Sequence, residues 1–423
     1  MSLLQIVGVA IGTVVLFWVL ILLRGSFDQY RNQNAQHELS QNLLSARVEM
    51  ARVQRRRIQQ LWELSWQGYR KFEVRRKVYE GESGICSFDL FPHDGRPLPP
   101  YQPGQFLTFQ LDIAGQTKPT VRCYSLSDCY RDGMDHYRVS IKKTLPPLDD
   151  PDAPPGLAST YFHQHVQEGD ILDVKAPAGT FVLDTERHTP VVLIAGGIGL
   201  TPLLSMLNAI VEGATLRETW LFYGVRNHTE RIMTEHLDAI RRQFDNVHIR
   251  VCYSHANSDE IRRQDYVCLE RISTDLLKRE LPSNNFSYYL CGTPPMMRAI
   301  SQGLKAWGVP AASIKTEAFG PASVTKRDSS EEEAHTPATA FTVTFSRSRK
   351  KAKWDPTVGS LLELAHANGV NIDCGCRAGS CGTCRVAIRT GDVEYLQRPD
   401  ADVEAGTCLT CIAVPKGHLE LDA

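Results

Sequence analysis

The chain has 423 residues, and its 47 Lys and Arg nearly balance its 48 Asp and Glu, so the formal net charge is −1. At about 100–200 residues per domain, this length predicts two to four domains. With 42% hydrophobic and 22% charged residues the composition is that of a globular protein, and it gives no sign of nucleic-acid binding.

An apolar run lies near the N-terminus. Residues 3–23 read LLQIVGVAIGTVVLFWVLILL. As a helix with a rise of about 1.5 Å per residue they would span about 31 Å, close to one hydrocarbon core. A signal peptide is the alternative, but no Lys or Arg precedes the run and bulky leucines end it. Because Arg24 and Arg31 follow, we expect a single-pass membrane anchor at 1–24, with the C-terminal domains facing the cytoplasm.

Residues 25–66 have a helical pattern, with no Gly or Pro between Ser26 and Gln67. We interpret them as a helical stalk. A cluster of arginines at 52 and 55–57 is either a solvated helix face or a contact with anionic lipid headgroups.

From residue 67 to 185 the pattern changes to short strands separated by Gly and Pro, such as ICSFDLFP, QFLTFQLDI and HYRVSIKK. This predicts an antiparallel β-barrel. At 190–207 the stretch PVVLIAGGIGLTPLLSML is an apolar strand, a glycine turn and a helix. Further apolar strands alternate with helical stretches, so 186–321 is predicted to be an α/β domain with a parallel sheet. Residues 322–338 are polar and charged, typical of a linker, and 339–423 form a last small domain.

The last domain contains CGCRAGSCGTC, in which Cys376, Cys381 and Cys384 have the C-x4-C-x2-C spacing of plant-type [2Fe–2S] ligands. Gly379 and Gly382 allow the backbone to fold closely around a cluster. Zinc or free thiols are the alternative, but the paired knuckles or histidines of zinc sites are missing from this loop.

The fourth ligand is Cys408 or Cys411 by position, and Cys374 is a spare cysteine. The stretch CLTCIAVP resembles the end of plant-type ferredoxins, in which the ligand is the cysteine separated from Pro by three residues. That resemblance implies Cys411, and it implies a β-grasp fold for 339–423.

The stretch RCYSLSD at 122–128 resembles the flavin motif of the ferredoxin–NADP reductase family. The neighbouring stretches PGQF, YRVSIKK and GLASTYFHQHV occur in the order of that family. An arginine can pair with a flavin phosphate, and a helix N-terminus can bind a pyrophosphate, which favours FAD over FMN. The resemblance implies flavin-binding roles for Arg122, Tyr124, Ser125, Gly156, Ala158, Ser159 and Thr160.

Two further stretches, AGGIGLTP and YLCGTPPMM, match the nicotinamide side of the same family, and TEAFGP resembles a segment of flavohemoglobin reductases. His255 stands where many NADPH-using relatives have arginine, which favours NADH, although Arg226 leaves NADPH open. The implied nucleotide-binding residues are Gly196, Gly197, Gly199, Thr201 and Gly292. The implied catalytic residues are Cys291, Glu317 and Phe319.

About 85% of the chain therefore resembles hybrid reductases with a flavin barrel, a nicotinamide domain and a C-terminal ferredoxin domain. The resemblance implies that NAD(P)H reduces FAD, and that electrons pass through the cluster to a partner oxygenase, hydroxylase or desaturase. The apolar N-terminal run departs from the soluble relatives. A respiratory NADH:quinone oxidoreductase, and a tethered ferredoxin-like carrier or redox sensor, are the alternative hypotheses.

Overall fold

The computed structural model forms two compact units, Met1–Glu63 and Leu64–Ala423. It describes 65–423 except 117–118, 147–149, 153, 214, 256–265, 320–340, 376–378, 380–381, 397–398 and 400–402, and before that only 16–18, 23–24, 41–49, 52–53, 55–56, 59–61 and 63–64. Residues 41–49, inside the predicted stalk, are helical. Among the described residues we find no helix with the length and apolar character needed to cross a membrane, and most of the predicted span at 3–23 lies outside them.

Six antiparallel strands form the predicted flavin barrel, in the order β4-β3-β6-β1-β2-β5. A bridge between Leu126 and Val139 joins the end of β4 to β5 and closes the barrel. Apolar residues alternate along β1, where Phe72 and Val74 enter the core. The elements are β1 Arg70–Tyr79, β2 Ile85–Pro92, β3 Phe106–Leu111, β4 Thr120–Ser125, β5 Tyr137–Lys142, α2 Leu157–Gln164 and β6 Ile171–Ala178.

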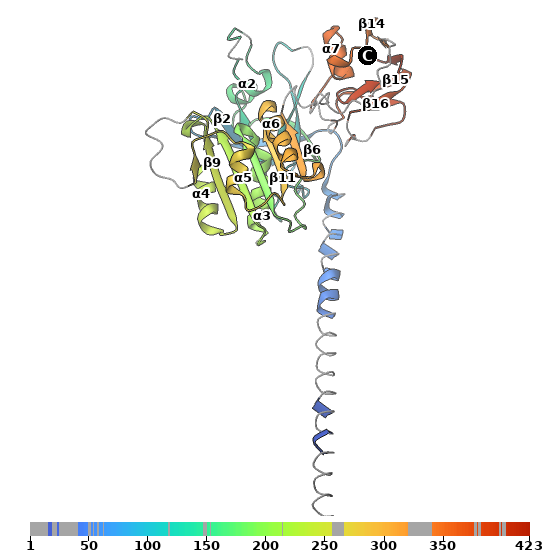
Figure 1. Ribbon diagram of the computed structural model, residues 1–423. Coiled ribbons are helices and arrows are strands. Elements are labelled where there is room, and N and C mark those ends of the chain that lie inside the picture. The colour runs from blue at the N-terminus through green and yellow to red at the C-terminus, as the bar shows by residue number, and fades with distance from the viewer. Residues whose placement is uncertain are drawn as a thin grey trace, which may run out of the picture. The chain divides into compact units, whose positions relative to one another are not determined.

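The second domain has a six-stranded parallel sheet in the order β10-β9-β8-β7-β11-β12. Helices pack on both faces, which explains why the strand VVLIAG is apolar throughout. Figure 1 shows this layered arrangement. The elements are β7 Val191–Gly196, η1 Gly197–Gly199, α3 Leu200–Glu212, β8 Thr219–Val225, η2 His228–Glu230, α4 Thr234–Gln243, β9 Val247–Tyr253, β10 Val267–Cys268, α5 Thr274–Glu280, β11 Ser287–Gly292, α6 Pro294–Ala306, η4 Ala311–Ser313 and β12 Ile314–Ala318.

The strand order of this sheet reverses between β7 and β11. In open α/β sheets, ligands bind outside the carboxyl ends of the strands at such a switch point. The glycine turn after β7 and the Cys-Gly pair at the end of β11 both lie there.

The C-terminal domain has a five-stranded sheet in the order β14-β13-β19-β15-β17, with a separate β16–β18 pair. Its apolar core is drawn from residues of this domain alone. The Ser360 hydroxyl caps helix α7 by accepting from the Glu363 backbone N–H at 3.3 Å. The elements are β13 Thr342–Phe345, β14 Lys350–Lys353, η6 Pro356–Val358, α7 Leu361–Ala367, β15 Arg385–Thr390, β16 Val393–Tyr395, β17 Thr407–Leu409, β18 Ala413–Pro415 and β19 Leu419–Leu421.

Candidate functional site

Strand β4 carries three of the seven predicted flavin-binding residues, Arg122, Tyr124 and Ser125. Tyr124 packs its ring edge-on against Phe109 and Phe162, with ring centroids 5.8 and 5.2 Å apart. Burial raises the pKa of Tyr124, so its phenol stays protonated at physiological pH. Arg122 is exposed, and its guanidinium donates to the neighbouring Val121 carbonyl at 2.7 Å. This strand therefore offers an aromatic face and an exposed cation, with Ser125 buried at its end.

The N-terminus of helix α2 is a tight turn built around Gly156. A Cβ at Gly156 would lie 2.6 Å from Thr144 Cβ, so only glycine fits there. The Ser159 hydroxyl donates to the Gly156 carbonyl at 3.0 Å and accepts from the Thr144 N–H at 3.1 Å, which holds the turn. Ala158 is also buried and anchors the helix on the barrel.

One polar atom in this turn is left without a partner. Thr160 Oγ1 is buried and has no hydrogen-bond partner in the part of the chain that the structure describes. The first turn carries no acidic side chain, and the first N–H groups of any helix lack intrahelical acceptors. An unpaired hydroxyl and free N–H groups fit the pyrophosphate of FAD.

At the switch point, the backbone at the end of β7 and just after it approaches the end of β11 so closely that a side chain at Gly196 or Gly199 would collide with neighbouring atoms. A Cβ on Gly199 would lie 2.2 Å from the Cys291 carbonyl oxygen. A Cβ on Gly196 would lie 2.7 Å from Met296 Sδ and 3.2 Å from Gly292 Cα. The ends of β7 and β11 thus meet at glycines, which leaves room for a nucleotide backbone.

The turn itself is fixed by two local features. Gly197 has φ of +55°, in the left-handed region that favours glycine. The Thr201 hydroxyl donates to the Ile198 carbonyl at 3.0 Å, which ties the first turn of α3 to the glycine segment.

Cys291 and Glu317 are direct partners in the β11–β12 register. Cys291 is fully buried, and burial, followed by the nearby Glu317 charge, raises the pKa of its thiol. Burial also raises the pKa of Glu317 to about 8, and its Oε2 has no hydrogen-bond partner among the described residues. At neutral pH this carboxyl is mostly protonated and can donate a hydrogen bond. Phe319, just beyond β12, is 38% exposed.

Two of the four predicted cluster ligands, Cys376 and Cys381, lie outside the described residues, whereas Cys384 and Cys411 are both buried. Among the described residues, no group of three or more His, Cys, Asp or Glu converges as a metal site. Cys408 is buried as well, so burial alone does not select the fourth ligand.

Contacts around the loop bring the segment with Cys408 and Cys411 close to Cys384, and Cys411 stays a prediction. A Cβ on Gly379 would lie 2.4 Å from Ile412 Cδ1, so the loop backbone runs beside the residue that follows Cys411. The Cys384 carbonyl accepts from the N–H of Thr410 at 3.1 Å and from its hydroxyl at 3.0 Å. The segment that contains Cys408 and Cys411 is thereby held against Cys384, which fits a thiolate cradle for a [2Fe–2S] cluster.

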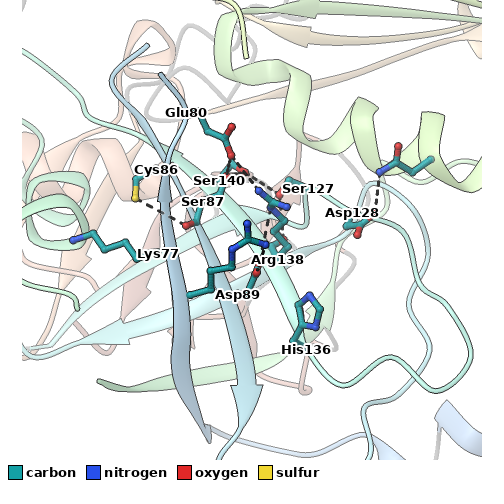
Figure 2. Close-up of polar contacts among 12 residues, drawn as sticks. Lys77, Glu80, Cys86, Ser87, Asp89, Ser127, Asp128, His136, Arg138 and Ser140 are labelled. Carbon is teal, nitrogen blue, oxygen red and sulfur yellow. Dashed lines mark hydrogen bonds and ion pairs between the residues drawn. The ribbon is translucent and has the colours of Figure 1, made fainter. Parts of the chain in front are cut away.

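Sequence reasoning missed a row of buried serines on the outer face of the barrel. Ser87 Oγ lies 2.7 Å from Ser140 Oγ, which lies 2.9 Å from Ser127 Oγ. Ser87 donates to Glu80 at 2.6 Å, and Arg138 donates to the same carboxylate oxygen at 3.1 Å. Figure 2 shows these residues joined in a row. The row ties β2 and β5 to Ser127, in the segment that follows β4.

Sequence reasoning also missed Asp128, three residues beyond Ser125. Its carboxylate and carbonyl oxygens accept bonds from helix α3, and Figure 2 shows the carboxylate paired away from the serine row. The stretch SLSD contains both Ser127 and Asp128, but no local pattern in it identifies their distant partners.

Two family models match the chain. The oxidoreductase NAD-binding domain matches residues 193–302, and the 2Fe-2S iron-sulfur cluster binding domain matches residues 343–416. The first runs from within β7 to within α6 and includes the glycine turn, and the second covers the cysteine loop together with Cys411.

Curated relatives of the chain include flavohemoproteins. The one from Halalkalibacterium halodurans is 38% identical over 258 residues, which are 61% of this chain and 61% of the relative. The one from Bacillus thuringiensis subsp. konkukian is 37% identical over 260 residues, 62% of this chain and 63% of the relative. The chain thus spans about three fifths of the length of these relatives.

Some solved structures match only the FAD- and NAD-binding part of the chain, and others match this part together with the C-terminal domain. The FAD/NAD-binding domain of nitric oxide dioxygenase from Vibrio cholerae has a TM-score of 0.52 and 32% identity, covering 60% of this chain and 100% of that one. Phthalate dioxygenase reductase, described as a modular structure for electron transfer from pyridine nucleotides to [2Fe-2S], has a TM-score of 0.50 and 25% identity, covering 84% and 98%. A FAD- and NAD-binding part is therefore followed in this chain by a 2Fe-2S domain.

Proposed function

Because this chain is an NAD(P)H-dependent flavin and iron–sulfur oxidoreductase with FAD and a [2Fe–2S] cluster as cofactors, we propose that it delivers electrons singly to a partner oxygenase, hydroxylase or desaturase. The observation that carries the proposal is the presence of the NAD-binding and 2Fe–2S domains in one chain. A cluster on the same chain provides a one-electron exit that a flavin domain alone lacks.

On the barrel, Arg122 and the N-terminus of α2 would hold the phosphates of FAD, with the Thr160 hydroxyl as one donor. Tyr124 and Ser125 would lie against the ring system. Bound flavin supplies the exchange between a hydride and single electrons. The residues of the chain bind and orient it and exclude water.

At the switch point, the glycine turn would receive the nucleotide, and Gly292 would leave space beside Cys291. Glu317 would hold a proton at its buried carboxyl near the reacting rings, and Phe319 would cover them. The buried Cys291 thiol would pack against the nicotinamide ring as a small neutral group.

We further propose NADH as the preferred donor. Arg226 Nε lies 3.6 Å from Glu230 Oε1, and Lys142 Nζ lies 3.9 Å from Glu230 Oε2. Glu230, the last residue of η2, thus partly neutralises Arg226, just after β8, and Lys142, at the end of β5, whereas an extra ribose phosphate would need a free positive charge. Comparing kcat/KM for NADH and NADPH tests this directly. A higher kcat/KM for NADPH would refute it.

The test of the electron exit uses the loop cysteines. Cys381→Ser should abolish NADH-dependent reduction of cytochrome c, whereas ferricyanide reduction, which flavin performs directly, should persist. Cys374→Ser is the matched control, because Cys374 stands outside the C-x4-C-x2-C spacing, and it should retain both activities. If Cys381→Ser retained cytochrome c reduction, the cluster would not be the exit.

We also propose that residues 1–24 anchor the enzyme in a membrane with the catalytic domains on the cytoplasmic side. The support is the apolar run at 3–23 followed by arginines. Fractionation of cells that express the full chain and a form lacking residues 1–24 should place only the former in membranes. The acceptor should then co-purify in mild detergent. Quinone reduction in lipid vesicles without a protein partner would instead favour a respiratory quinone reductase.

A further inference from the structure

A polar cluster links the flavin barrel to helix α3. Ser205 and Asn208, on one face of the helix, approach the loop that follows β4. The Ser205 hydroxyl donates to the Asp128 carbonyl at 2.5 Å, and Asn208 Nδ2 donates to Asp128 Oδ1 at 2.8 Å. One turn further along, Glu212 accepts from Arg131 Nε at 2.7 Å. We call these five residues the Asp128 clamp.

Asp128 is held as a fully hydrogen-bonded anion. Besides Asn208, its carboxylate accepts from the Cys129 N–H at 2.8 Å and from both terminal nitrogens of Arg131, at 2.7 and 3.0 Å. Its carbonyl also accepts from the Tyr101 hydroxyl at 2.8 Å. Burial acts to raise the pKa of Asp128, but the Arg131 and Asn208 donors outweigh it and keep the pKa below its usual range.

The orientation of the Asn208 amide is determined by its two partners. Because Nδ2 donates to Asp128, Oδ1 is left to accept, and His236 Nε2 lies 2.7 Å from it. Asn208 is buried, so neither amide group has water as a substitute partner. An aspartate at position 208 would instead place a second carboxylate against Asp128.

The clamp lies near both cofactor segments along the chain. Asp128 follows Ser125, the end of the flavin strand, by three residues. Ser205 lies six residues after Gly199 within rigid α3, about 9 Å along the helix axis. Because so few residues separate the clamp from either segment, a shift at the clamp would move the glycine turn relative to β4.

Resting on the function proposed above, we propose that Asp128 and Asn208 are positioning residues that fix the nicotinamide-binding turn against the flavin barrel for hydride transfer. Neither residue is among those placed in the cofactor-binding machinery. Their role is to set the geometry between two sites that other residues form. Displacements of about 1 Å at a reacting centre can reduce rates about 100-fold.

The experiment measures flavin reduction by NADH in single turnovers of the full-length holoenzyme. Asn208→Asp should lower the limiting rate at least about tenfold, while the dissociation constant of NADH stays within about twofold, because the glycine turn itself is intact. FAD content should stay close to that of the unchanged enzyme, and the rates are compared well below the thermal midpoint, which the second buried carboxylate should lower. Gln243→Glu, which adds the same charge on the exposed end of α4, should leave the rate unchanged.

The exchange variant Asp128→Asn with Asn208→Asp restores one carboxylate and one amide at the contact. It should recover part of the lost rate, because the pair of carboxylates is removed while Arg131 then faces an amide. If Asn208→Asp does not fold, Ser205→Ala removes only the bond to the Asp128 carbonyl and should give the same effect in weaker form. An unchanged limiting rate in the folded variants, or no recovery in the exchange variant, would overturn the proposal.

The proposed function is judged separately. When the flavin is reduced photochemically, transfer to the cluster and on to cytochrome c bypasses the clamp and should be normal in every clamp variant. If that transfer fails in the unchanged enzyme, the proposed electron exit is wrong. The positioning role of the clamp is still tested by the rate at which NADH reduces the flavin.

Discussion

Replacing Gly199 with alanine tests the switch-point geometry most directly. The new Cβ would lie 2.2 Å from the Cys291 carbonyl oxygen, 2.5 Å from its carbonyl carbon and 2.9 Å from the Gly292 nitrogen. All three are backbone atoms of β11, so no side chain can rotate away. Reaching the 3.0 Å below which real Cβ contacts essentially never occur requires a displacement of about 0.8 Å between the glycine turn and β11.

The cost of this displacement has two parts. Overpacking of this kind typically destabilises a domain by about 1–3 kcal/mol. A shift approaching 1 Å at the hydride-transfer geometry should lower the rate of flavin reduction by NADH about 100-fold. Transfer from photoreduced flavin to the cluster does not use this turn and should be unaffected.

The assay is stopped-flow reduction of the bound flavin by NADH, with thermal unfolding measured in parallel. Gly417→Ala serves as the control, because its Cβ would meet nothing within 4 Å. Gly196→Ala should be milder than Gly199→Ala, since its nearest obstacle is the flexible Met296 side chain. A Gly199→Ala enzyme with normal flavin reduction would refute the geometric reasoning.

Three further predictions concern one buried hydroxyl without a hydrogen-bond partner among the described residues and two carboxyls whose pKa values are shifted. Thr160→Val should weaken FAD binding about five- to tenfold by equilibrium dialysis, if its buried hydroxyl donates to the pyrophosphate; equal affinity would rule that contact out. The raised pKa of Glu317 means that the folded state holds a proton which the unfolded state releases above about 4.5, so the unfolding free energy should fall as pH rises towards 8. Glu317→Gln should remove this slope, by up to about 1.4 kcal/mol per pH unit in urea titrations, and a persistent slope would assign it to another group. Arg70 lowers the pKa of Asp94, so stability should be lost as pH falls below about 4 and Asp94→Asn should show a flatter acid limb in far-UV circular dichroism; an identical acid limb would show that this pair contributes nothing.

The fold could be predicted where local patterns reflect burial. The strand VVLIAG is apolar throughout because helices cover both faces of its sheet, and the alternation in β1 follows from a barrel with one interior face. The cysteine spacing and the glycine turn are equally local, because each occupies a stretch of about ten residues.

The Asp128 clamp and the serine row could not be predicted in this way. Asp128 lies 77 and 80 residues from Ser205 and Asn208, and Ser87 lies 53 residues from Ser140. From the local sequence alone, a serine or asparagine on an otherwise apolar helix is predicted to face solvent. Only the docking of α3 on the barrel loop turns those two residues into buried hydrogen-bond donors.

Strand β14 lies at the edge of the C-terminal sheet and exposes three lysines, Lys350, Lys351 and Lys353. Unpaired edge strands invite pairing with a second molecule, and charged side chains oppose it by repulsion. The lysines therefore protect this edge of a domain that has its own apolar core. The same lysines make neutral or apolar substitutions on this edge an unexpected source of aggregation in any engineered form of the chain.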